Sequence, residues 1–219
     1  MRVAEPRRCD ISVATGMLVN GDGHYRKTYR DLAGLYADAA GFEAILAEKA
    51  DKVAYEVTSY TPGEKTSDLI MGVTRMEPGK VGREFFLTRG HIHARGDRPE
   101  IYHTLSGRGV MQLESPGGEV RLVEMGPQQV CYVPPFWIHR SVNIGSEDLV
   151  MFFSYPADSG QDYGIIERSG GMRVRVMDET GYDAIWLAEH HFTGYSVCPS
   201  VHVMGSYVAA RTQRLRIGT

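Results

Sequence analysis

The chain has little cysteine: only Cys9, Cys131 and Cys198 occur among its 219 residues. An odd number of widely spaced cysteines forms neither a disulfide framework nor a cysteine-rich zinc site. The sequence therefore excludes the small disulfide-stapled folds of secreted proteins. It predicts a reducing, cytoplasmic setting.

Long hydrophobic runs and an excess of positive charge are also missing. No apolar stretch reaches the length of a transmembrane helix, and the N-terminal residues lack the apolar segment of a signal peptide. With 24 basic and 27 acidic residues, the formal net charge is −3. We therefore expect neither nucleic acid nor a membrane as a partner, and any phosphate binding needs a local pocket.

What the sequence does contain is typical of a globular protein of moderate size. Hydrophobic residues make up 42% of the chain, which is enough for a sizeable core. Residues 1–28 are polar and predict an irregular arm. In residues 29–50 apolar side chains recur three and four positions apart, and Gly34 and Gly41 interrupt this pattern, so it predicts two short helices.

Strand signals dominate from residue 53 to residue 155. The segments are rich in β-branched and aromatic side chains, and Gly/Pro turns such as residues 61–63 and 115–118 separate them. Roughly eight to ten short strands broken by such turns are typical of an antiparallel sandwich or barrel. The predicted fold class is therefore all-β, and a small barrel of this kind can enclose one ligand.

The pattern changes again after residue 170. The apolar run 184–188, a helical pattern over residues 200–212 and a final strand-like run follow one another in the manner of an α/β protein. We therefore predict two parts: an all-β domain over residues 1–170 and a short α/β fragment over residues 177–219.

Three histidines and one glutamate form a candidate metal site. His91 and His93 stand two residues apart in an extended segment, so their side chains point to the same face. Glu100 opens the next strand, and His139 belongs to a third strand. Imidazole nitrogens and a carboxylate that meet at one point suit a first-row divalent metal, and this ligand set does not discriminate among iron, manganese, zinc and nickel.

The spacing of these four residues, together with Gly107, Gly126 and Asn143, resembles the two-part pattern of the cupin superfamily. That resemblance implies a double-stranded β-helix, or jelly-roll, barrel. The surrounding sequence, over about residues 27–168, closely resembles the cupin-type phosphoglucose (glucose-6-phosphate) isomerases. The resemblance is carried by residues 31–38 (DLAGLYAD), 72–74 (GVT), 78–82 (PGKVG), 84–91 (EFFLTRGH), 132–140 (YVPPFWIHR) and 155–166 (YPADSGQDYGII).

The resemblance implies an enzyme that interconverts glucose 6-phosphate and fructose 6-phosphate, uses one divalent metal ion and forms a homodimer. It makes metal ligands of His91, His93, Glu100 and His139. Residues at positions that hold the phosphate or line its pocket are Thr74, Thr88, Gly90, Tyr155 and Tyr163. Tyr102 matches a residue that faces the sugar. Gln161 departs from the histidine expected there, and it can hydrogen-bond a sugar hydroxyl but carries no proton at neutral pH.

An aldose–ketose exchange moves a hydrogen between C1 and C2 of the open-chain sugar. The metal would polarise the carbonyl, and Glu100 could carry the proton through a cis-enediol. A metal-assisted hydride shift is the rival mechanism, and the sequence does not separate the two. Two other classes of protein stay open: another metal-dependent cupin enzyme, such as an iron dioxygenase, and a non-catalytic sugar- or metal-binding cupin.

The C-terminal fragment resembles a different family. Residues 181–192 (GYDAIWLAEHHF) and 209–219 (AARTQRLRIGT) are similar to an early part of the luciferase-like flavin monooxygenases, which are α/β barrels. The sequence holds about one and a half βα units, whereas such a barrel needs eight. We therefore expect a truncated fragment that cannot hold flavin by itself.

Overall fold

The computed structural model describes residues 5–12, 14–178, 184–186 and 216–218. Contacts between Cα atoms divide the chain into two units, Met1–Met177 and Asp178–Thr219. In the second unit, β16 (Ala184–Trp186) and β17 (Arg216–Gly218) pair in parallel. The helical pattern predicted over residues 200–212 lies outside the described residues.

The larger sheet of the first unit has six strands in the order β12-β9-β14-β5-β4-β3, and neighbouring strands run antiparallel. The strands are β3 (Gly23–Thr28), β4 (Val53–Tyr60), β5 (Leu69–Met76), β9 (Glu100–Ser106), β12 (Val130–Val133) and β14 (Leu149–Pro156). Alternation along β9 sets its two faces, because Glu100, Tyr102 and Thr104 are buried whereas Ile101 is exposed.

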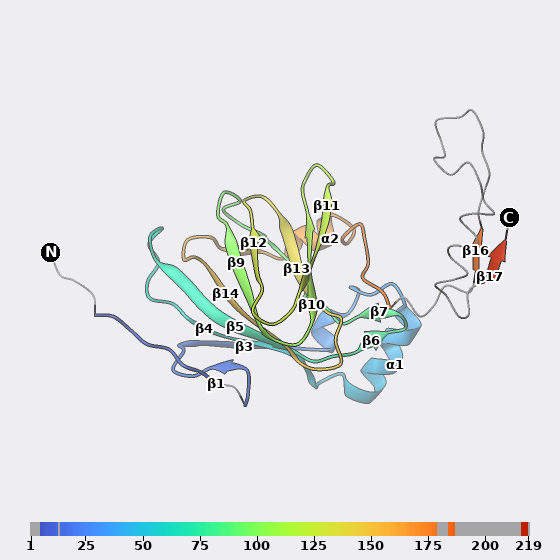
Figure 1. Ribbon diagram of the computed structural model, residues 1–219, viewed down its shortest axis with the longest axis horizontal. Coiled ribbons are helices and arrows are strands. Elements are labelled where there is room, and N and C mark those ends of the chain that lie inside the picture. Colours follow the sequence, from blue (N-terminus) through green and yellow to red (C-terminus); the bar gives the residue numbers. More distant parts are fainter. Residues whose placement is uncertain (1–4, 13, 179–183, 187–215, 219) are drawn as a thin grey trace. The chain divides into compact units, whose positions relative to one another are not determined.

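A three-stranded sheet covers the inner face of the larger one. It consists, in spatial order, of β11 (Val120–Met125), β10 (Gly109–Glu114) and β13 (Ile138–Asn143). Met111 of β10 belongs to the same hydrophobic core as Tyr102 and Phe153 of the larger sheet, so the core lies between the two sheets. The prediction of an all-β cupin barrel is confirmed by this arrangement (Figure 1).

Two short helices precede the barrel, as the interrupted periodicity predicted. They are the 3-10 helix η1 (Arg30–Leu32) and the α-helix α1 (Ala39–Lys49). Asp38 caps α1 by accepting a hydrogen bond from the Gly41 N–H, and Phe42 stacks on Tyr36 at 5.0 Å between ring centroids. These contacts join α1 to the core. A third helix, α2 (Gly164–Arg168), follows the last barrel strand.

The prediction of an irregular arm over residues 1–28 was wrong. In the described part, β1 (Ile11–Ser12) pairs with β2 (Met17–Leu18), and β3 extends the larger sheet by pairing with β4. The strand β3 lies at the sheet edge, where exposed residues such as His24 and Arg26 replace the apolar alternation of an interior strand. For that reason its sequence carries no strand signal.

Residues 172–176 form no strand. Instead the segment is extended beside β7 (Glu84–Phe85), where the Phe85 N–H donates to the Val176 carbonyl at 3.1 Å. The Gln112 side chain donates to the Val174 carbonyl at 2.7 Å. A β7 of two residues offers too short an edge for a regular ladder.

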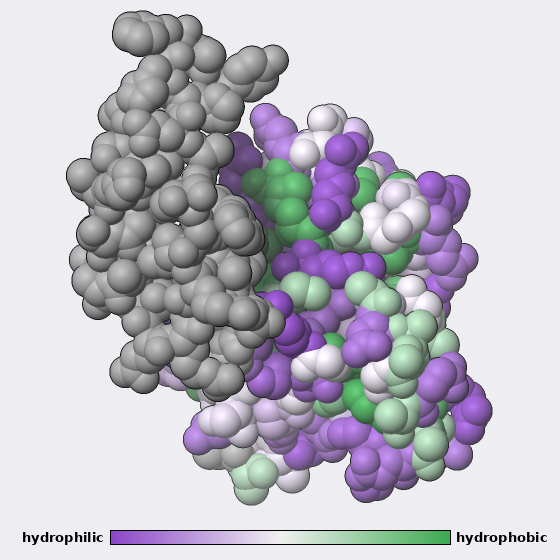
Figure 2. Space-filling view, turned by 90° about the vertical axis from the view of Figure 1, so that its right-hand side faces the viewer, coloured by the Kyte–Doolittle hydropathy of each residue, from purple (hydrophilic) through white to green (hydrophobic). Residues whose placement is uncertain are grey.

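Two short strands, β8 (Ile92–His93) and β15 (Gln161–Asp162), pair with each other and carry candidate site residues. Another short strand, β6 (Lys80–Val81), pairs with β7. Figure 2 shows mostly hydrophilic residues over the described surface in that view, with smaller hydrophobic patches among them. Among the described residues, no helix is both long enough and apolar enough to cross a membrane.

Candidate metal centre and active site

Three separate strands bring the candidate metal ligands together. His91 and His139 form a bridge in which each backbone N–H donates to the other's carbonyl, at 3.1 and 2.9 Å. His93 ends β8, and Glu100 is the first residue of β9. Backbone pairing therefore holds His91 and His139 next to each other, in addition to their side-chain contacts.

All four ligand side chains converge on one buried point. One donor atom from each of them lies within 4.8 Å of all the others. The Glu100 Oε2 atom is 3.0 Å from His139 Nε2, 3.2 Å from His93 Nε2 and 3.8 Å from His91 Nε2. Each of the four residues has an exposed fraction of 8% or less. The sequence prediction that the side chains meet is confirmed by this geometry.

Backbone carbonyls orient two of the imidazoles. His93 Nδ1 lies 2.8 Å from the Arg98 carbonyl, and His139 Nδ1 lies 3.0 Å from the Trp137 carbonyl. A carbonyl only accepts, so each Nδ1 carries the proton and donates it. In the neutral imidazole the Nε2 lone pair is then directed at the cluster, which is the arrangement typical of histidines that ligate metals. When no ion is bound, a protonated Nε2 can instead donate to the Glu100 carboxylate.

The ionisation of the cluster suits a cation. Burial, reinforced by His139, lowers the pKa of His91 to about 3, so this imidazole is neutral at pH 7. Burial by itself would raise the pKa of Glu100, but hydrogen bonds from His139 and His93 lower it to about 2. Burial by itself would lower the pKa of His93, but the hydrogen bond and charge of Glu100 outweigh burial and raise the His93 pKa.

One buried atom of the cluster has no hydrogen-bond partner among the described residues. His91 Nε2 is buried and makes no hydrogen bond with any described residue. A buried polar atom of this kind costs free energy unless a ligand satisfies it. Three imidazole nitrogens and one carboxylate oxygen are ligands that first-row divalent ions accept, so these residues could hold a metal ion.

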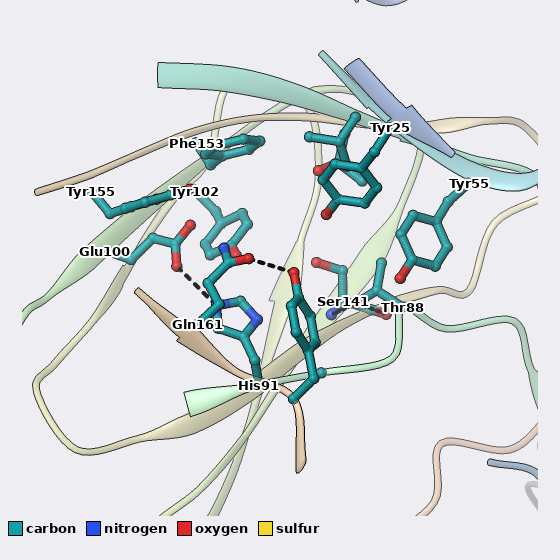
Figure 3. A pocket seen from close by; sticks show the side chains of 14 residues that line it. Tyr25, Tyr55, Thr88, His91, Glu100, Tyr102, Ser141, Phe153, Tyr155 and Gln161 are labelled. Atoms are coloured by element: carbon teal, nitrogen blue, oxygen red, sulfur yellow. Dashed lines mark hydrogen bonds and ion pairs between the residues drawn. The ribbon is translucent and has the colours of Figure 1, made fainter. Parts of the chain in front are cut away.

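A pocket of about 440 Å³, its open mouth included, adjoins this cluster, and we call it the substrate pocket. Every residue that sequence reasoning assigned to the substrate lines it. They are Thr74, Thr88, Gly90, Glu100, Tyr102, Tyr155, Gln161 and Tyr163, and the metal-ligand candidate His91 joins them. Figure 3 shows the hydroxyl groups of several of these side chains directed into one space.

The backbone of residues 88–90 forms one wall of the substrate pocket. Thr88 Oγ1 accepts a hydrogen bond of 3.0 Å from the Ser141 N–H, which ties this segment to β13. Gly90 has a φ of +85°, and a Cβ placed there would lie 3.1 Å from the Cβ of Arg140. Glycine therefore allows this segment to lie close to β13.

Gln161 and Tyr163 form a second wall that crosses the mouth of the substrate pocket. Gln161 pairs with His93 across β15 and β8, and the Tyr163 hydroxyl donates to the Gln161 side-chain carbonyl (Figure 3). The Tyr163 ring lies 5.4 Å from that of His91 between centroids. The residue that departs from the expected histidine is therefore placed beside the candidate metal ligands.

Sequence reasoning missed five other residues of the substrate pocket: Tyr25, Tyr55, Val57, Ser141 and Phe153. For three of them a signal existed. Ser141 lies two positions after His139 on the same face of β13, and Tyr55 and Val57 alternate in β4. Tyr25 gave none, because it belongs to the polar edge strand β3.

Similar proteins identify the family. The sequence model of the family described as glucose-6-phosphate isomerase (GPI) matches residues 26–190. Putative glucose-6-phosphate isomerase 1 of Rhizobium meliloti (strain 1021) is 58% identical over 178 residues, which are 81% of this chain and 83% of the relative. Glucose-6-phosphate isomerase of Thermococcus kodakarensis is 42% identical over 181 residues, which are 83% of this chain and 94% of the relative.

A solved structure of an oxalate oxidase is also similar, with a TM-score of 0.44 and 17% identity over 52% of this chain and 56% of that chain. That similarity is too low to support an inference about function. The two sheets and the buried cluster of three histidines and one glutamate define a cupin with a metal-ligand set.

Within that class, the chain belongs to the glucose-6-phosphate isomerase family. The resemblance seen in the sequence of the barrel is thereby confirmed. The resemblance of the C-terminal fragment to luciferase-like monooxygenases stays a prediction, and most of its residues lie outside the described part of the chain.

Proposed function

We propose that this chain interconverts glucose 6-phosphate and fructose 6-phosphate with one divalent metal ion. The observation that carries the proposal is the position of the buried ligand cluster, because His91 and Glu100 also line a pocket rich in hydroxyl groups. Relatives named glucose-6-phosphate isomerase support the choice of substrate. An open-chain sugar phosphate needs both features, one for its carbonyl end and one for its phosphate.

The metal ion would be held by His91, His93, Glu100 and His139, and iron, manganese, zinc and nickel all suit this set. When bound, such an ion supplies Lewis-acid polarisation of the substrate carbonyl. The protein fixes the orientation of the ligands through the Arg98 and Trp137 carbonyls, which accept from His93 and His139.

The phosphate would be held by neutral donors. Thr74, Thr88, Gly90, Tyr155 and Tyr163 are the residues assigned to it, and no lysine or arginine is among the residues that line the substrate pocket. Hydroxyl groups and backbone N–H groups bind a phosphate through directed hydrogen bonds, without help from net charge. Tyr102 and Gln161 would contact the sugar hydroxyls.

Glu100 is assigned the proton transfer. Its carboxylate is ionised at neutral pH and lines the substrate pocket. It would take the proton from C2 of the open-chain aldose while the C–H electron pair forms the C1–C2 double bond of an enediol. The proton then returns to C1, and a second proton passes from O2 to O1, so the sugar gains and loses no atoms.

Isotope exchange separates this route from a hydride shift. Turnover in D2O through Glu100 introduces deuterium at the carbon that receives the proton, because a carboxylic acid exchanges with solvent. A direct shift from C2 to C1 keeps the original hydrogen. Product free of deuterium after complete conversion, analysed by mass spectrometry, would remove the proton-carrier role from Glu100.

A coupled assay tests the activity itself. With fructose 6-phosphate as substrate and detection of glucose 6-phosphate, the full-length chain should turn over, and so should the control Arg108→Gln, whose side chain is 71% exposed. Oxygen consumption without isomerisation would point instead to a cupin dioxygenase. Sugar phosphate binding without turnover would point to a non-catalytic binding protein.

We also propose that the chain forms a homodimer. Ile101 of β9 and Val130 and Tyr132 of β12 are exposed hydrophobic residues on neighbouring strands, and Tyr132 pairs directly with Ile101. A contiguous apolar surface on an edge strand favours association with a second copy. Light scattering of the wild type should give twice the chain mass of 24.4 kDa. The variant Tyr132→Asp should be monomeric. The control Val19→Asp, at an exposed valine outside this surface, should stay dimeric. A monomeric wild type would contradict this proposal.

A cytoplasmic location and a two-part organisation complete the proposal. Cys9 and Cys131 are free thiols, which suits a reducing compartment. All residues of the substrate pocket lie between positions 25 and 163, so the domain over residues 1–170 would carry the activity. The fragment over residues 177–219 would then contribute nothing to the site.

A further inference from the structure

A second cavity lies on the other side of the wall that residues 88–90 form. It holds about 830 Å³ of space, its open mouth included, and we call it the arginine cavity. Arg89, Arg140 and Arg175 line it, together with the carboxylates of Asp31 and Glu167. No residue is shared with the lining of the substrate pocket. The isomerase assignment gives this cavity no role.

Alternation along β13 explains why Arg140 faces this cavity. His139 belongs to the metal cluster and Ser141 lines the substrate pocket, so the residue between them points to the opposite face. In the same way, Thr88 and Gly90 line the substrate pocket and Arg89 lines the arginine cavity. The two cavities are thus the front and back of the same two backbone segments.

Arg140 is a buried cation without a direct ion pair among the described residues, and the Glu84 and Glu114 carboxylates act on its charge only from farther away. Its exposed fraction is 4%, its Nε donates to the Gln112 side chain at 2.9 Å, and it forms no ion pair with any described residue. Burial lowers its pKa to about 10, which still leaves the guanidinium charged at pH 7. A buried charge that lacks a partner is costly, and its remaining N–H groups need acceptors.

The other charges of the arginine cavity are largely matched. Arg89 pairs with Glu167, although Arg89 Nε is buried and has no partner among the described residues. Arg175 pairs with Glu84 at 2.8 Å. Asp31 accepts hydrogen bonds from the backbone and side chain of Thr28, at 2.7 and 2.9 Å. Arg140 is therefore the arginine of this cavity that lacks a direct ion pair, and the free Arg89 Nε adds a donor.

We propose that the arginine cavity binds a small anion that carries a phosphate group. Guanidinium groups present paired donors that match the oxygens of a phosphate, and a buried guanidinium without a direct ion pair has N–H groups left for such a partner. The part of the cavity that water-sized atoms can fill is about 320 Å³, which lies at the lower end of the range of sites for small ligands. The ligand is either inorganic phosphate or a small phosphorylated metabolite. The two differ because only a metabolite has a further group that can contact the rest of the cavity.

Occupation of the arginine cavity affects the substrate pocket through the shared segments. An anion on Arg89 and Arg140 fixes residues 88–90 and 139–141, whose other faces carry Thr88, Gly90 and Ser141. Anion binding should therefore change the KM of the reaction. Binding itself does not depend on the isomerase assignment, because it is measured without a sugar substrate.

Calorimetric titration of the full-length chain with inorganic phosphate tests the proposal. We expect two phosphate sites per chain: one that Thr88→Val weakens, and a second that Arg89→Gln and Arg140→Lys weaken about tenfold or more, because each change removes donors to the phosphate. Arg108→Gln, at an exposed arginine outside both cavities, should change neither site. Circular dichroism verifies that each variant is folded.

The controls separate the possible outcomes. Glycerol 3-phosphate that binds the second site more tightly than inorganic phosphate supports a phosphorylated metabolite, and equal affinity supports free phosphate. The proposal is overturned if folded Arg89→Gln binds phosphate with the same stoichiometry and affinity as the wild type. It is also overturned if chloride competes as well as phosphate, since this would indicate unspecific attraction.

Discussion

Glu100 contacts three imidazoles at once and also lines the substrate pocket, so one carboxylate carries two roles. Burial, followed by the charge and hydrogen bond of Glu100, raises the pKa of Tyr102 well above its ordinary value. Tyr102 is therefore a protonated hydroxyl beside an ionised carboxylate. Such a pair keeps the acceptor and donor roles at the sugar distinct.

Replacement of Glu100 by glutamine tests the proton-transfer role. The amide keeps the shape of the side chain but cannot act as a base, so kcat should fall by about three orders of magnitude while the thermal unfolding curve stays cooperative. Metal analysis of the purified variant is the control, because Glu100 is also one of the proposed metal ligands. A metal-loaded variant with a near-normal rate would show that another group moves the proton.

Asp158 supports the cluster from outside. It accepts hydrogen bonds from Arg98 Nε and Nη2, both at 2.9 Å, and the Arg98 backbone carbonyl in turn accepts from His93. The Arg98 hydrogen bonds hold the pKa of the Asp158 carboxyl well below its usual range. Because the pKa is lower in the folded state, this carboxylate stabilises the fold above the unfolded pKa of about 4 and loses the effect as pH falls below it.

The variant Asp158→Asn should therefore unfold a few degrees below the wild type at pH 7. The difference should shrink as the pH falls from about 5 to about 2, because the wild-type carboxylate is progressively protonated there. Thermal scans of both proteins across this interval provide the measurement. A difference in unfolding temperature that stays constant over the interval would exclude the linkage.

Residues 88–90 are the element that separates the two cavities, and Gly90 makes their path possible. At a φ of +85° an alanine is strained, and its Cβ would lie 3.1 Å from the Arg140 Cβ and 3.3 Å from the His139 carbonyl oxygen. Gly90→Ala should lower the free energy of unfolding by about 1–3 kcal/mol and reduce kcat/KM. Chemical denaturation measures the first effect.

Gly117→Ala is the matched control for this element. A Cβ there meets only Ser115 Oγ, at 3.6 Å. Its free energy of unfolding should stay close to that of the wild type. Equal stability of both alanine variants would mean that the segment relaxes without cost, against the fixed wall described for residues 88–90.

The interior strands were predictable, and the edge strand β3 was not. The strand β4 lies inside the larger sheet and carries the β-branched and aromatic side chains of a buried strand, so the strand signals in the sequence begin where β4 begins. At the edge, β3 satisfies half of its backbone with water and needs no such pattern. Tyr25, which β3 carries into the substrate pocket, was therefore out of reach of the sequence.

The site shows the same division. His91, His93, Glu100 and His139 could be assigned because their types and spacing are rare together. Tyr55 and Ser141 carry only the weaker signal of alternation along a strand, because the pairing of distant segments decides which face of the strand turns inward. The arginine cavity is a property of two such segments back to back. No local pattern reveals it.

The division of the whole chain into two units predicts a tolerant truncation. A chain that ends at Met177 retains Val174 and Arg175, whose backbone and side chain bond to Gln112 and Glu84 in the barrel. It should keep kcat within about twofold, since all residues of the substrate pocket are present. The coupled assay measures this kcat. A chain that ends at residue 170 lacks the Val174 and Arg175 contacts, so its free energy of unfolding should be lower than that of the chain that ends at Met177.

The central claim is that the four buried ligands hold one catalytic divalent ion. The most direct measurement removes that ion from the full-length enzyme with a chelator, then follows metal content and activity together as manganese or iron is added back. The account predicts that activity disappears with the metal and returns in proportion to its uptake, to saturation at one ion per chain. Full isomerase activity in protein shown by elemental analysis to be metal-free would contradict it.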